Sequence, residues 1–560
     1  MTDPTFHAAL DSAKRLHQAG RIQDAQSLYR QILSRQPDHP DALHLLGVIQ
    51  FQQGQPDAAM ELIRRAIAVD PGRAEFHCNL GVVLADVGRD PDAIVAFQHA
   101  LDLRPAYPEA HHNLGNSLRE IGWIDQAIAH FRQALAIQPG DTDSHDNLLY
   151  AMHYHPDYDA AALLREHLEW NRRHARPLAA HIQPHANDRD PDRRLRIGYV
   201  SPDLRVHPVG RFLLPLFARH DHQRFEIVCF YNAAVEDDVT RYLRGHADRW
   251  HDISAMSDEE AAELIRREQI DILVDLSLHM AHNRLLVFAR KPAPVQVTYL
   301  AYCGTSGLET MDYRLTDPYL DPEGMDESVY TEKSMRLPRT YWCYEPCIRD
   351  VAVKAPPAGQ GGGVTFGCFN NYCKVSRATW ETWGRLLQAV PGSRLMVCCP
   401  LGAHREQVRG ELAAAGVDPQ RLIFAAKVPM VEYLERYHEV DIGLDPFPYG
   451  GGTTTCDALW MGVPVVSLRG RTAVGRGGVS ILSNLGLAEL IAENTDQYVA
   501  IAKALAEDLP RLAELRGGLR QRMRRSPLMD GEQFARDVEW AYRQMWRNWC
   551  QTRSGHAPNR

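Results

Sequence analysis

The 560-residue sequence lacks several features that mark other classes of protein. Its eleven cysteines include no CxxC pair, so no zinc or disulfide framework is indicated and a reducing compartment is expected. No apolar run approaches the ~18 residues that cross a membrane, and the first residues have no apolar core typical of signal peptides. The net charge of −9 argues against a basic surface for nucleic acid. We therefore expect a cytoplasmic protein without a membrane span or a nucleic-acid partner.

The first third of the chain contains a repeat of 34 residues. Three residue types recur in register, at Gly20, Gly54, Gly88 and Gly122, at Ala25, Ala59, Ala93 and Ala127, and at Pro37, Pro71, Pro105 and Pro139. A helix, a glycine turn, a second helix and a proline with this period are typical of the tetratricopeptide repeat. Four repeats run from about 6 to 141, and a degenerate fifth follows to about 175. Such repeats stack into a superhelix with a concave groove, so we expect residues 1–176 to bind peptides.

Three asparagines, Asn79, Asn113 and Asn147, also lie 34 residues apart on the first helix of successive repeats. Asparagine is a mediocre helix former, so these are either polar positions on a wet face or residues kept for binding. A carboxamide can donate and accept hydrogen bonds together, which suits the backbone of an extended peptide. We therefore treat the three asparagines as candidate acceptor-peptide-binding residues.

From residue 194 onward, short apolar segments alternate with helical stretches. The strand-like segments are LRIGYVSPDL, FEIVCFY, IDILVDLSL and PVQVTYLAY, and then VTFGCFN, RLMVCCP, RLIFAAK, DIGLDPF and VPVVSL. This alternation predicts parallel sheets built from βαβ units. We expect a linker at 177–193, a Rossmann-like lobe at 194–345, a linker at 346–363, and a second lobe with C-terminal helices at 364–560. Ligands of such sheets bind beyond the carboxyl ends of the strands.

The segment DPFPYGGGTTTCDALWMGVP at 445–464 carries the sharpest local motif. Three glycines, Gly450, Gly451 and Gly452, allow the backbone to approach a bulky ligand. Three threonines then open a short helix, whose N-terminus favours an anion; they are Thr453, Thr454 and Thr455. Asp457, one turn later, is suited to accept the hydroxyls of a ribose. The alternative is an ordinary glycine loop with a threonine N-cap.

Two further residues follow predicted strands. Lys374, in GCFNNYCK, could place its ammonium on a diphosphate bound at the threonine loop. His207, in SPDLRVHPVGRF, could act as a base or as a hydrogen-bond donor. Taken singly, each could equally be an exposed lysine or a structural histidine. Their shared place after strands of the two lobes makes them candidate catalytic residues.

At these motifs the chain resembles the tetratricopeptide-bearing O-GlcNAc transferases, in particular bacterial ones, over nearly all of residues 6–550. The likeness rests on the repeats and on GYVSPDLRVHPVGR, KPAPVQVTYLAYCGTSG, FNNYCK and GGTTTCDALWMGVPVVSL. It implies the GT-B architecture of two Rossmann-like lobes. It also implies metal-independent transfer of a sugar from a nucleotide diphosphate to protein hydroxyls, with inversion at the anomeric carbon. UDP-GlcNAc is the expected donor, UDP the product, serine or threonine the acceptor, and no cofactor is expected.

The resemblance also implies residue roles. The lysine that contacts the β-phosphate corresponds to Lys374, with Asn371 beside it, and the diphosphate-binding threonines correspond to Thr453 and Thr454. The ribose-binding acid corresponds to Asp457.

The active-site histidine of the family corresponds to His207. Tyr433 and Arg436 stand where family enzymes hold the nucleotide base. The asparagine ladder is a family feature for gripping the acceptor peptide.

Two departures from the animal enzymes concern the donor sugar. Gly452 occupies a histidine position, and Tyr449 replaces a cysteine near the sugar. Plant relatives that transfer fucose from GDP-fucose share this style of loop. The alternatives are therefore a GDP-fucose O-fucosyltransferase, a glycan-elongating or asparagine-modifying transferase, and a repeat-protein adaptor whose catalytic lobes have decayed. Retention of Lys374, the three threonines and Asp457 together argues against decay.

Overall fold

The structure, a computed structural model, describes residues 4–552. These residues form two compact units. The first comprises the chain up to 144 with the short segment 400–406, and the second comprises 145–399 and 407 onward. Each unit has a buried core of its own.

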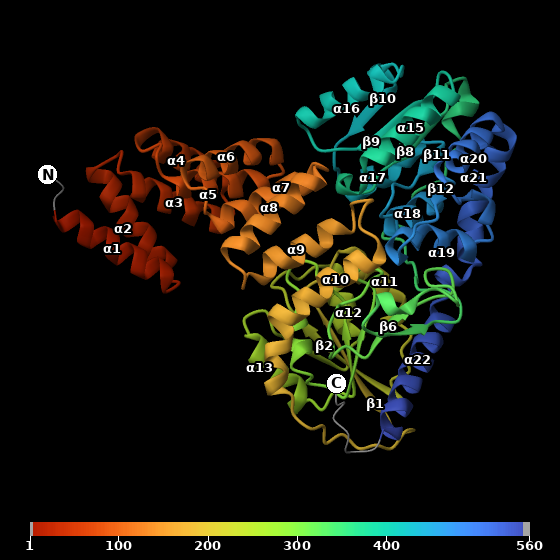
Figure 1. The fold of residues 1–560 in the computed structure, drawn as a ribbon, viewed down its shortest axis with the longest axis horizontal. Coiled ribbons are helices and arrows are strands. Elements are labelled where there is room, and N and C mark those ends of the chain that lie inside the picture. The colour runs from red at the N-terminus through yellow and green to blue at the C-terminus, as the bar shows by residue number, and fades with distance from the viewer. Residues whose placement is uncertain (1–3, 553–560) are drawn as a thin grey trace. The chain divides into compact units, whose positions relative to one another are not determined.

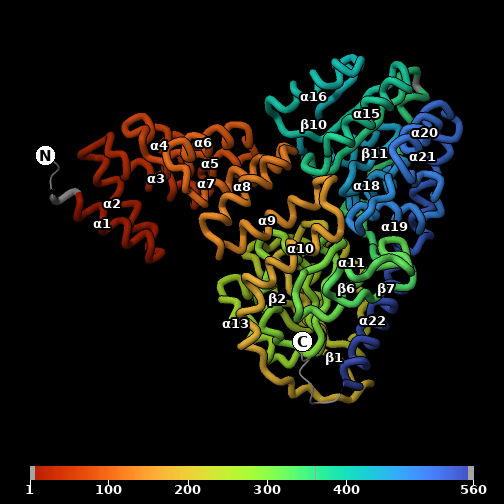
Figure 2. Tube along the Cα trace, in the orientation of Figure 1, coloured from red at the N-terminus to blue at the C-terminus, as the bar shows by residue number. Residues whose placement is uncertain are grey.

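The first unit is a row of antiparallel helix pairs, as Figure 2 shows along the start of the trace. Its helices are α1 Pro4–Gln18, α2 Ile22–Arg35, α3 Pro40–Gln52, α4 Pro56–Val69, α5 Ala74–Asp86, α6 Asp90–Leu103, α7 Pro108–Glu120 and α8 Ile124–Ile137. The predicted turn glycines join the two helices of each pair with φ between +73° and +78°. Within the pairs, a Cβ on Gly81 would lie 2.5 Å from Phe97, so the helices approach too closely there for any larger residue. The predicted repeat array is confirmed.

The fifth helix pair is α9 Thr142–Met152 and α10 Ala160–Trp170. From His145 onward this pair belongs to the second unit. The degenerate repeat is therefore part of the same compact body as the two lobes. A short π-helix at Asn171–Ala175 and a 3-10 helix at Arg176–His181 follow, and a segment without regular structure leads to the first strand.

The first lobe of the second unit contains a seven-stranded parallel sheet of order β3-β2-β1-β4-β5-β6-β7. Its strands are β1 Leu195–Ser201, β2 Phe225–Tyr231, β3 Arg249–Asp252, β4 Ile272–Asp275, β5 Val295–Thr298, β6 Tyr313–Thr316 and β7 Lys333–Arg336. Its helices are α11 Pro208–Phe217, α12 Asp238–Gly245, α13 Asp258–Arg267 and α14 Leu285–Ala289. The sequence analysis missed β3, β6 and β7, whose charged residues interrupt the apolar pattern expected of a buried strand.

The second lobe contains a six-stranded parallel sheet of order β10-β9-β8-β11-β12-β13. Its strands are β8 Thr365–Cys368, β9 Arg394–Cys398, β10 Leu422–Ala425, β11 Ile442–Leu444, β12 Val465–Leu468 and β13 Ile491–Ala492. The helices after β8 are α15 Arg377–Ala389, α16 Ala403–Ala414, α17 Met430–Glu435, α18 Thr453–Trp460, α19 Gly477–Asn484, α20 Thr495–Glu507, α21 Leu509–Arg524 and α22 Gly531–Gln551. The prediction of two doubly wound lobes is confirmed.

The last helix returns to the first lobe, beside α11 and β1 (Figure 1). The hydroxyl groups of Tyr542 on α22 and Tyr199 on β1 lie 3.1 Å apart, and Glu539 accepts a hydrogen bond from the backbone N–H of Asp221 at 2.8 Å. Helix α22 therefore packs against the first lobe, although it follows the second lobe in the sequence. Among residues 4–552 no helix is both long and apolar enough to span a membrane.

The strand orders locate the sites where ligands can bind. In each sheet the order reverses beside the lobe's first strand, between β1 and β4 in the first lobe and between β8 and β11 in the second. Doubly wound sheets bind ligands in the crevice at this switch point, beyond the carboxyl ends of the strands. His207 follows β1, Lys374 follows β8, and the glycine–threonine loop follows β11.

Candidate functional site

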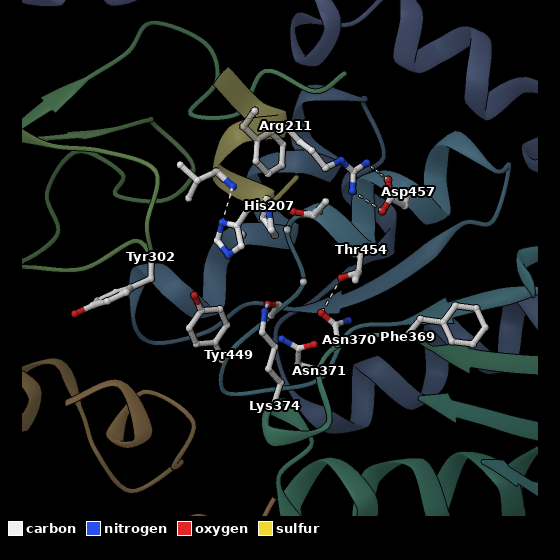
Figure 3. A pocket seen from close by; sticks show the side chains of 18 of the residues that line it. His207, Arg211, Tyr302, Phe369, Asn370, Asn371, Lys374, Tyr449, Thr454 and Asp457 are labelled. Carbon is white, nitrogen blue, oxygen red and sulfur yellow. Dashed lines mark hydrogen bonds and ion pairs between the residues drawn. The ribbon is translucent and has the colours of Figure 1, made fainter. Parts of the chain in front are cut away.

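A cavity of about 470 Å³ in the second unit collects residues from both switch points (Figure 3). The first lobe contributes His207, Arg211 and the segment 300–303, and α9 contributes Tyr150. The second lobe contributes nearly all of the residues predicted to bind the nucleotide sugar; these are Asn371, Lys374, Tyr433, Arg436, Gly451, Gly452, Thr453, Thr454 and Asp457. The two catalytic candidates and these binding candidates therefore line one cavity.

The buried carboxylate of Asp445 holds the loop between β11 and α18 in place. Asp445 accepts hydrogen bonds from the hydroxyl of Thr455 at 2.9 Å and from the hydroxyl of Ser467. A Cβ on Gly451 would lie 2.2 Å from the Thr455 hydroxyl oxygen and 2.6 Å from Asp445 Oδ1, so only glycine fits there. Thr455 is buried and does not line the cavity. Its hydroxyl bonds to Asp445 and positions the loop, and its predicted contact with the ligand stays a prediction.

The other two threonines lie at the start of α18 on the cavity wall. Gly452 is the N-cap and no side chain caps the helix, so the first backbone N–H groups of α18 have no side-chain acceptor. The Thr454 hydroxyl donates to Asn370 Oδ1 at 2.7 Å. Asn370 was not among the predicted residues, although it stands beside Asn371 in the same motif. The arrangement provides donors and a positive dipole end for an anion.

Lys374 lies at the end of a 3-10 turn after β8, Tyr372–Lys374. Its ammonium donates to the carbonyl oxygen of Gly450 at 3.0 Å and lies 4.1 Å from the ring centroid of Tyr449. Burial lowers the pKa of the Lys374 ammonium. The lysine is therefore held at the glycine loop, in the cavity that α18 opens onto, and a phosphate entering there would meet both.

His207 is the N-cap of α11, with its Nδ1 accepting from the backbone N–H of Val209 at 3.3 Å. A Cβ on Gly210 would lie 2.2 Å from the carbonyl oxygen of Arg205, so glycine permits the tight turn that presents the histidine. Burial lowers the pKa of His207. In Figure 3 the ring lies over the cavity with its second nitrogen directed inward.

The two ring nitrogens of His207 allow two functions. With Nδ1 accepting from Val209, a neutral ring carries its hydrogen on Nε2 and donates into the cavity. Asp203 Oδ2 lies 3.5 Å from Nδ1 and would favour the opposite tautomer, in which Nε2 is a base. The geometry therefore supports both a positioning and a proton-accepting function.

Asp457 is engaged by an arginine of the other lobe. Arg211 on α11 donates from Nη2 to Oδ1 at 2.7 Å and from Nη1 to Oδ2 at 3.2 Å. The hydroxyl of Tyr344 donates to Oδ1 at 2.6 Å, and the hydroxyl of Tyr433 donates to Oδ2 at 3.2 Å. Both Arg211 and Asp457 are buried. Sequence reasoning missed Arg211, although its charge stands within the quoted HPVGR motif.

The three remaining candidates lie around this acid and the neighbouring loop. Tyr433 shares a hydrogen bond with Tyr437, hydroxyl to hydroxyl, at 2.9 Å. Arg436 lies on the following turn and donates to the carbonyl of Ala426. Asn371 is exposed at the cavity. Their predicted contacts with the base and phosphates stay predictions.

The asparagine ladder is used for contacts between repeats. In the first unit, Asn79 on α5 hydrogen-bonds Nε2 of His44 on α3 at 2.7 Å. Burial raises the pKa of the Cys78 thiol on α5, and Asn113 on α7 lies close enough to oppose that shift. In each case the asparagine reaches the residue at the preceding position of the previous repeat. Asn147 lies half-buried on α9 in the second unit. Peptide binding by these residues stays a prediction.

The described part of the chain has no cluster of side chains that could form a metal centre. Within residues 4–552 no group of three or more His, Cys, Asp or Glu residues is placed to hold a metal ion. The metal-independence of the reaction stays a prediction.

Residues 144–346 and 360–538 match the model of glycosyl transferase family 41, and residues 16–79, 83–122 and 108–141 match tetratricopeptide repeat models. The chain belongs to glycosyl transferase family 41.

Three similar proteins are informative. The "Probable UDP-N-acetylglucosamine--peptide N-acetylglucosaminyltransferase SPINDLY" of Petunia hybrida is 39% identical over 414 residues, covering 72% of this chain and 44% of that protein. The SEC protein of Arabidopsis thaliana, with the same printed activity, is 31% identical over 376 residues, covering 65% and 38%. The structure of a mutant Thermobaculum terrenum O-GlcNAc transferase matches with a TM-score of 0.79 and 37% identity, covering 98% of this chain and 99% of that one. The chain thus spans less than half the length of the plant relatives.

Proposed function

We propose that the protein transfers GlcNAc from UDP-GlcNAc to serine or threonine hydroxyls of protein acceptors, with inversion and without a metal ion. One observation carries this proposal. The ammonium of Lys374 and the N-terminus of α18 open onto the same cavity as His207 of the other lobe. The names of the similar proteins, peptide N-acetylglucosaminyltransferase and O-GlcNAc transferase, support the donor and the peptide acceptor.

The reaction needs one bond to form as another breaks. The acceptor hydroxyl oxygen bonds to the anomeric carbon from one face while the bond from that carbon to the β-phosphate oxygen breaks on the other. Negative charge grows on the departing diphosphate. Preorganised donors directed at such a charge lower the barrier, and Lys374 and the first amides of α18 are placed to supply them.

The hydroxyl proton has two candidate destinations. His207 can take it on Nε2 in the tautomer that Asp203 favours, or a phosphate oxygen of the leaving diphosphate can take it. In the second case His207 donates a hydrogen bond and orients the acceptor. Either way the proton leaves the acceptor oxygen as the glycosidic bond forms.

A second donor, GDP-fucose, is favoured by one observation. Tyr449 lines the cavity beside Lys374 and fills the place for which the resemblance gives a cysteine near the sugar. A bulky ring leaves less room for a 2-acetamido group than a cysteine does. UDP-GlcNAc remains the first proposal because the names of the plant relatives specify it.

A donor panel tests both proposals. Hydrolysis and transfer to a protein acceptor are measured with UDP-GlcNAc, UDP-glucose, GDP-fucose and GDP-mannose, each with and without EDTA. We expect turnover with UDP-GlcNAc that EDTA does not change. Turnover with GDP-fucose alone would replace the first proposal by the second. If no nucleotide or nucleotide sugar raises the melting temperature or turns over, the protein is a repeat-protein adaptor.

A further inference from the structure

The fifth helix pair, α9 and α10, contributes to the wall of the cavity. Tyr150 on α9 lines the cavity together with Met280 and the segment 300–303 of the first lobe. These residues stand opposite the second lobe, which supplies the predicted nucleotide-binding side chains. This wall, here called the acceptor wall, is defined as Tyr150, Met280 and residues 300–303. If the proposed function holds, it faces the acceptor.

A buried carboxylate ties α9 to the first lobe one helical turn before Tyr150. Asp146 is 6% exposed. Its Oδ1 lies 2.7 Å from Nδ1 of His279, and its Oδ2 accepts from Nδ2 of Asn283 at 2.7 Å. His279 and Asn283 lie in the segment between β4 and α14, and His279 is 1% exposed. Both carboxylate oxygens therefore have partners from the catalytic lobe.

Both ring nitrogens of His279 lie near oxygen atoms. Its Nε2 lies 2.8 Å from the carbonyl oxygen of Ser306, which accepts only. Its Nδ1 faces the Asp146 carboxylate, which also only accepts when ionised. Both ring nitrogens therefore face oxygen atoms at hydrogen-bond distance, and Asp146 and His279 form a buried hydrogen-bonded pair. The ring also stands perpendicular to Trp170 of α10, with centroids 4.8 Å apart. Removing one partner of such a pair leaves a buried polar group without its hydrogen bond.

The Asp146–His279 contact lies close in sequence to two residues of the acceptor wall. Tyr150 is four residues after Asp146, on the same face of the helix, and Met280 is bonded to His279 along the chain. Tyr302 is held in addition by the second helix of the pair, because its hydroxyl lies 3.3 Å from Nε2 of His167. The Nδ1 of His167 faces the carbonyl of Leu163 at 2.7 Å. That contact places the hydrogen on Nδ1 and leaves Nε2 to accept from Tyr302.

The backbone leaves little freedom for this junction to shift. A Cβ on Gly307 would lie 2.7 Å from the carbonyl oxygen of His167, so the loop after β5 touches the backbone of α10. His153 on the turn after α9 is fully enclosed, and its ring centroid lies 4.7 Å from that of Tyr302. The acceptor wall is thus built jointly by the helix pair and the lobe.

We propose that Asp146 and His279 are positioning residues for the acceptor: they hold the acceptor wall in place, so they govern capture of the protein substrate and not of the nucleotide sugar. The proposal rests on the proposed function for the identity of that substrate. It assigns to the degenerate repeat a part in the active site.

The disruptive variant is D146A, and the conservative variant is D146N. The amide of D146N can donate to Nδ1 of a neutral His279 and accept from Asn283, so the hydrogen bonds persist without the charge. D157N is the control, since Asp157 is exposed beyond the end of α9. We expect D146A to raise the KM for a protein acceptor at least tenfold, D146N to stay within threefold of the wild type, and D157N to be unchanged. UDP affinity and UDP-GlcNAc hydrolysis should change less than twofold in all three.

Hydrogen–deuterium exchange separates this proposal from the proposed function. Amides of α9 should exchange faster in D146A than in D146N, whether or not any donor turns over. If D146A does not fold, N283A removes one of the two partners and should give a smaller rise in the same KM. An unchanged acceptor KM in D146A or N283A, or an equal loss of hydrolysis and transfer, would overturn the proposal. Absence of turnover in the wild type with every donor would instead remove the proposed function.

Discussion

Arg211 and Asp457 join the two lobes across the cavity through a bidentate ion pair. A carboxylate offers about four lone-pair sites, and four donors from Arg211, Tyr344 and Tyr433 occupy the two oxygens. Any ribose hydroxyl that bonds to this acid must therefore displace one of them. The residue predicted to recognise ribose also connects the lobes.

Replacing Arg211 with methionine should destabilise the protein by about 3–5 kcal/mol, because Asp457 would keep a buried charge without its partner. Thermal unfolding of the full chain measures this as a lower midpoint. R211K keeps the charge but cannot bind in a bidentate way. Its unfolding midpoint should therefore lie between those of the wild type and R211M. The double variant R211M/D457N should recover part of the loss, and an R211M midpoint equal to the wild type would show that the pair contributes nothing.

Replacing Lys374 with alanine should slow transfer by about 10²–10³-fold, the typical cost of losing one donor to a developing oxyanion. Unchanged turnover would eliminate the assignment. The pH dependence has a definite sign. Burial lowers the pKa of Lys374, so its charge is lost as the pH rises through a value below the ordinary 10.5. The alkaline limb of kcat/KM for the donor should therefore lie below pH 10.5. K374R, if active, should shift that limb upward.

Replacing His207 with alanine should abolish transfer while donor affinity, measured by calorimetry with UDP, stays within a few-fold. Burial lowers the pKa of His207, so the ring becomes charged only below its ordinary 6.5. If its neutral form is required, transfer should fall on the acid side of pH 6.5. D203N separates the two functions. A base that depends on the Asp203 tautomer should lose activity in D203N, whereas a hydrogen-bond donor should not. Full activity in H207A would make the histidine structural.

Replacing Gly451 with alanine should raise the donor KM at least tenfold and lower the melting midpoint. The new methyl group would lie 2.2 Å from the Thr455 hydroxyl oxygen, and the loop would have to move away from Asp445. Gly450 is the matched control, because a Cβ there meets its nearest neighbour at 3.9 Å. G450A should melt at the wild-type midpoint. Equal effects of the two variants would show that the loop is loose.

Much of the fold was predictable because it is periodic. The turn glycines of the repeats need positive φ, and buried parallel strands are uninterrupted apolar runs, so both leave a direct pattern in the sequence. The strands β3, β6 and β7 could not be found in this way. They lie at the outer part of the sheet and carry Arg249, Arg314 and Lys333. Arg249 is paired with Glu268 and Arg314 with Asp321, whereas Lys333 is exposed.

The candidate site was predictable where one motif supplies several groups, as in the loop from Gly450 to Asp457. What could not be predicted is how those groups are already engaged. The Thr455 hydroxyl is bound to Asp445, Asp457 is bound to Arg211 from 246 positions away, and Asn79 is bound to a histidine of the preceding repeat. Such pairings depend on tertiary contacts, and no local spacing encodes them.

The inclusion of α9 and α10 in the second unit has a consequence for how such proteins can vary. The helix pair α9 and α10 belongs to the same compact unit as the two lobes. Changes in the number of repeats therefore have to occur before it in the sequence. Insertion or loss of whole 34-residue repeats there would change the length of the repeat array while the residues that line the cavity stay the same. Trimmed versions for crystallisation or assay should accordingly start ahead of Thr142.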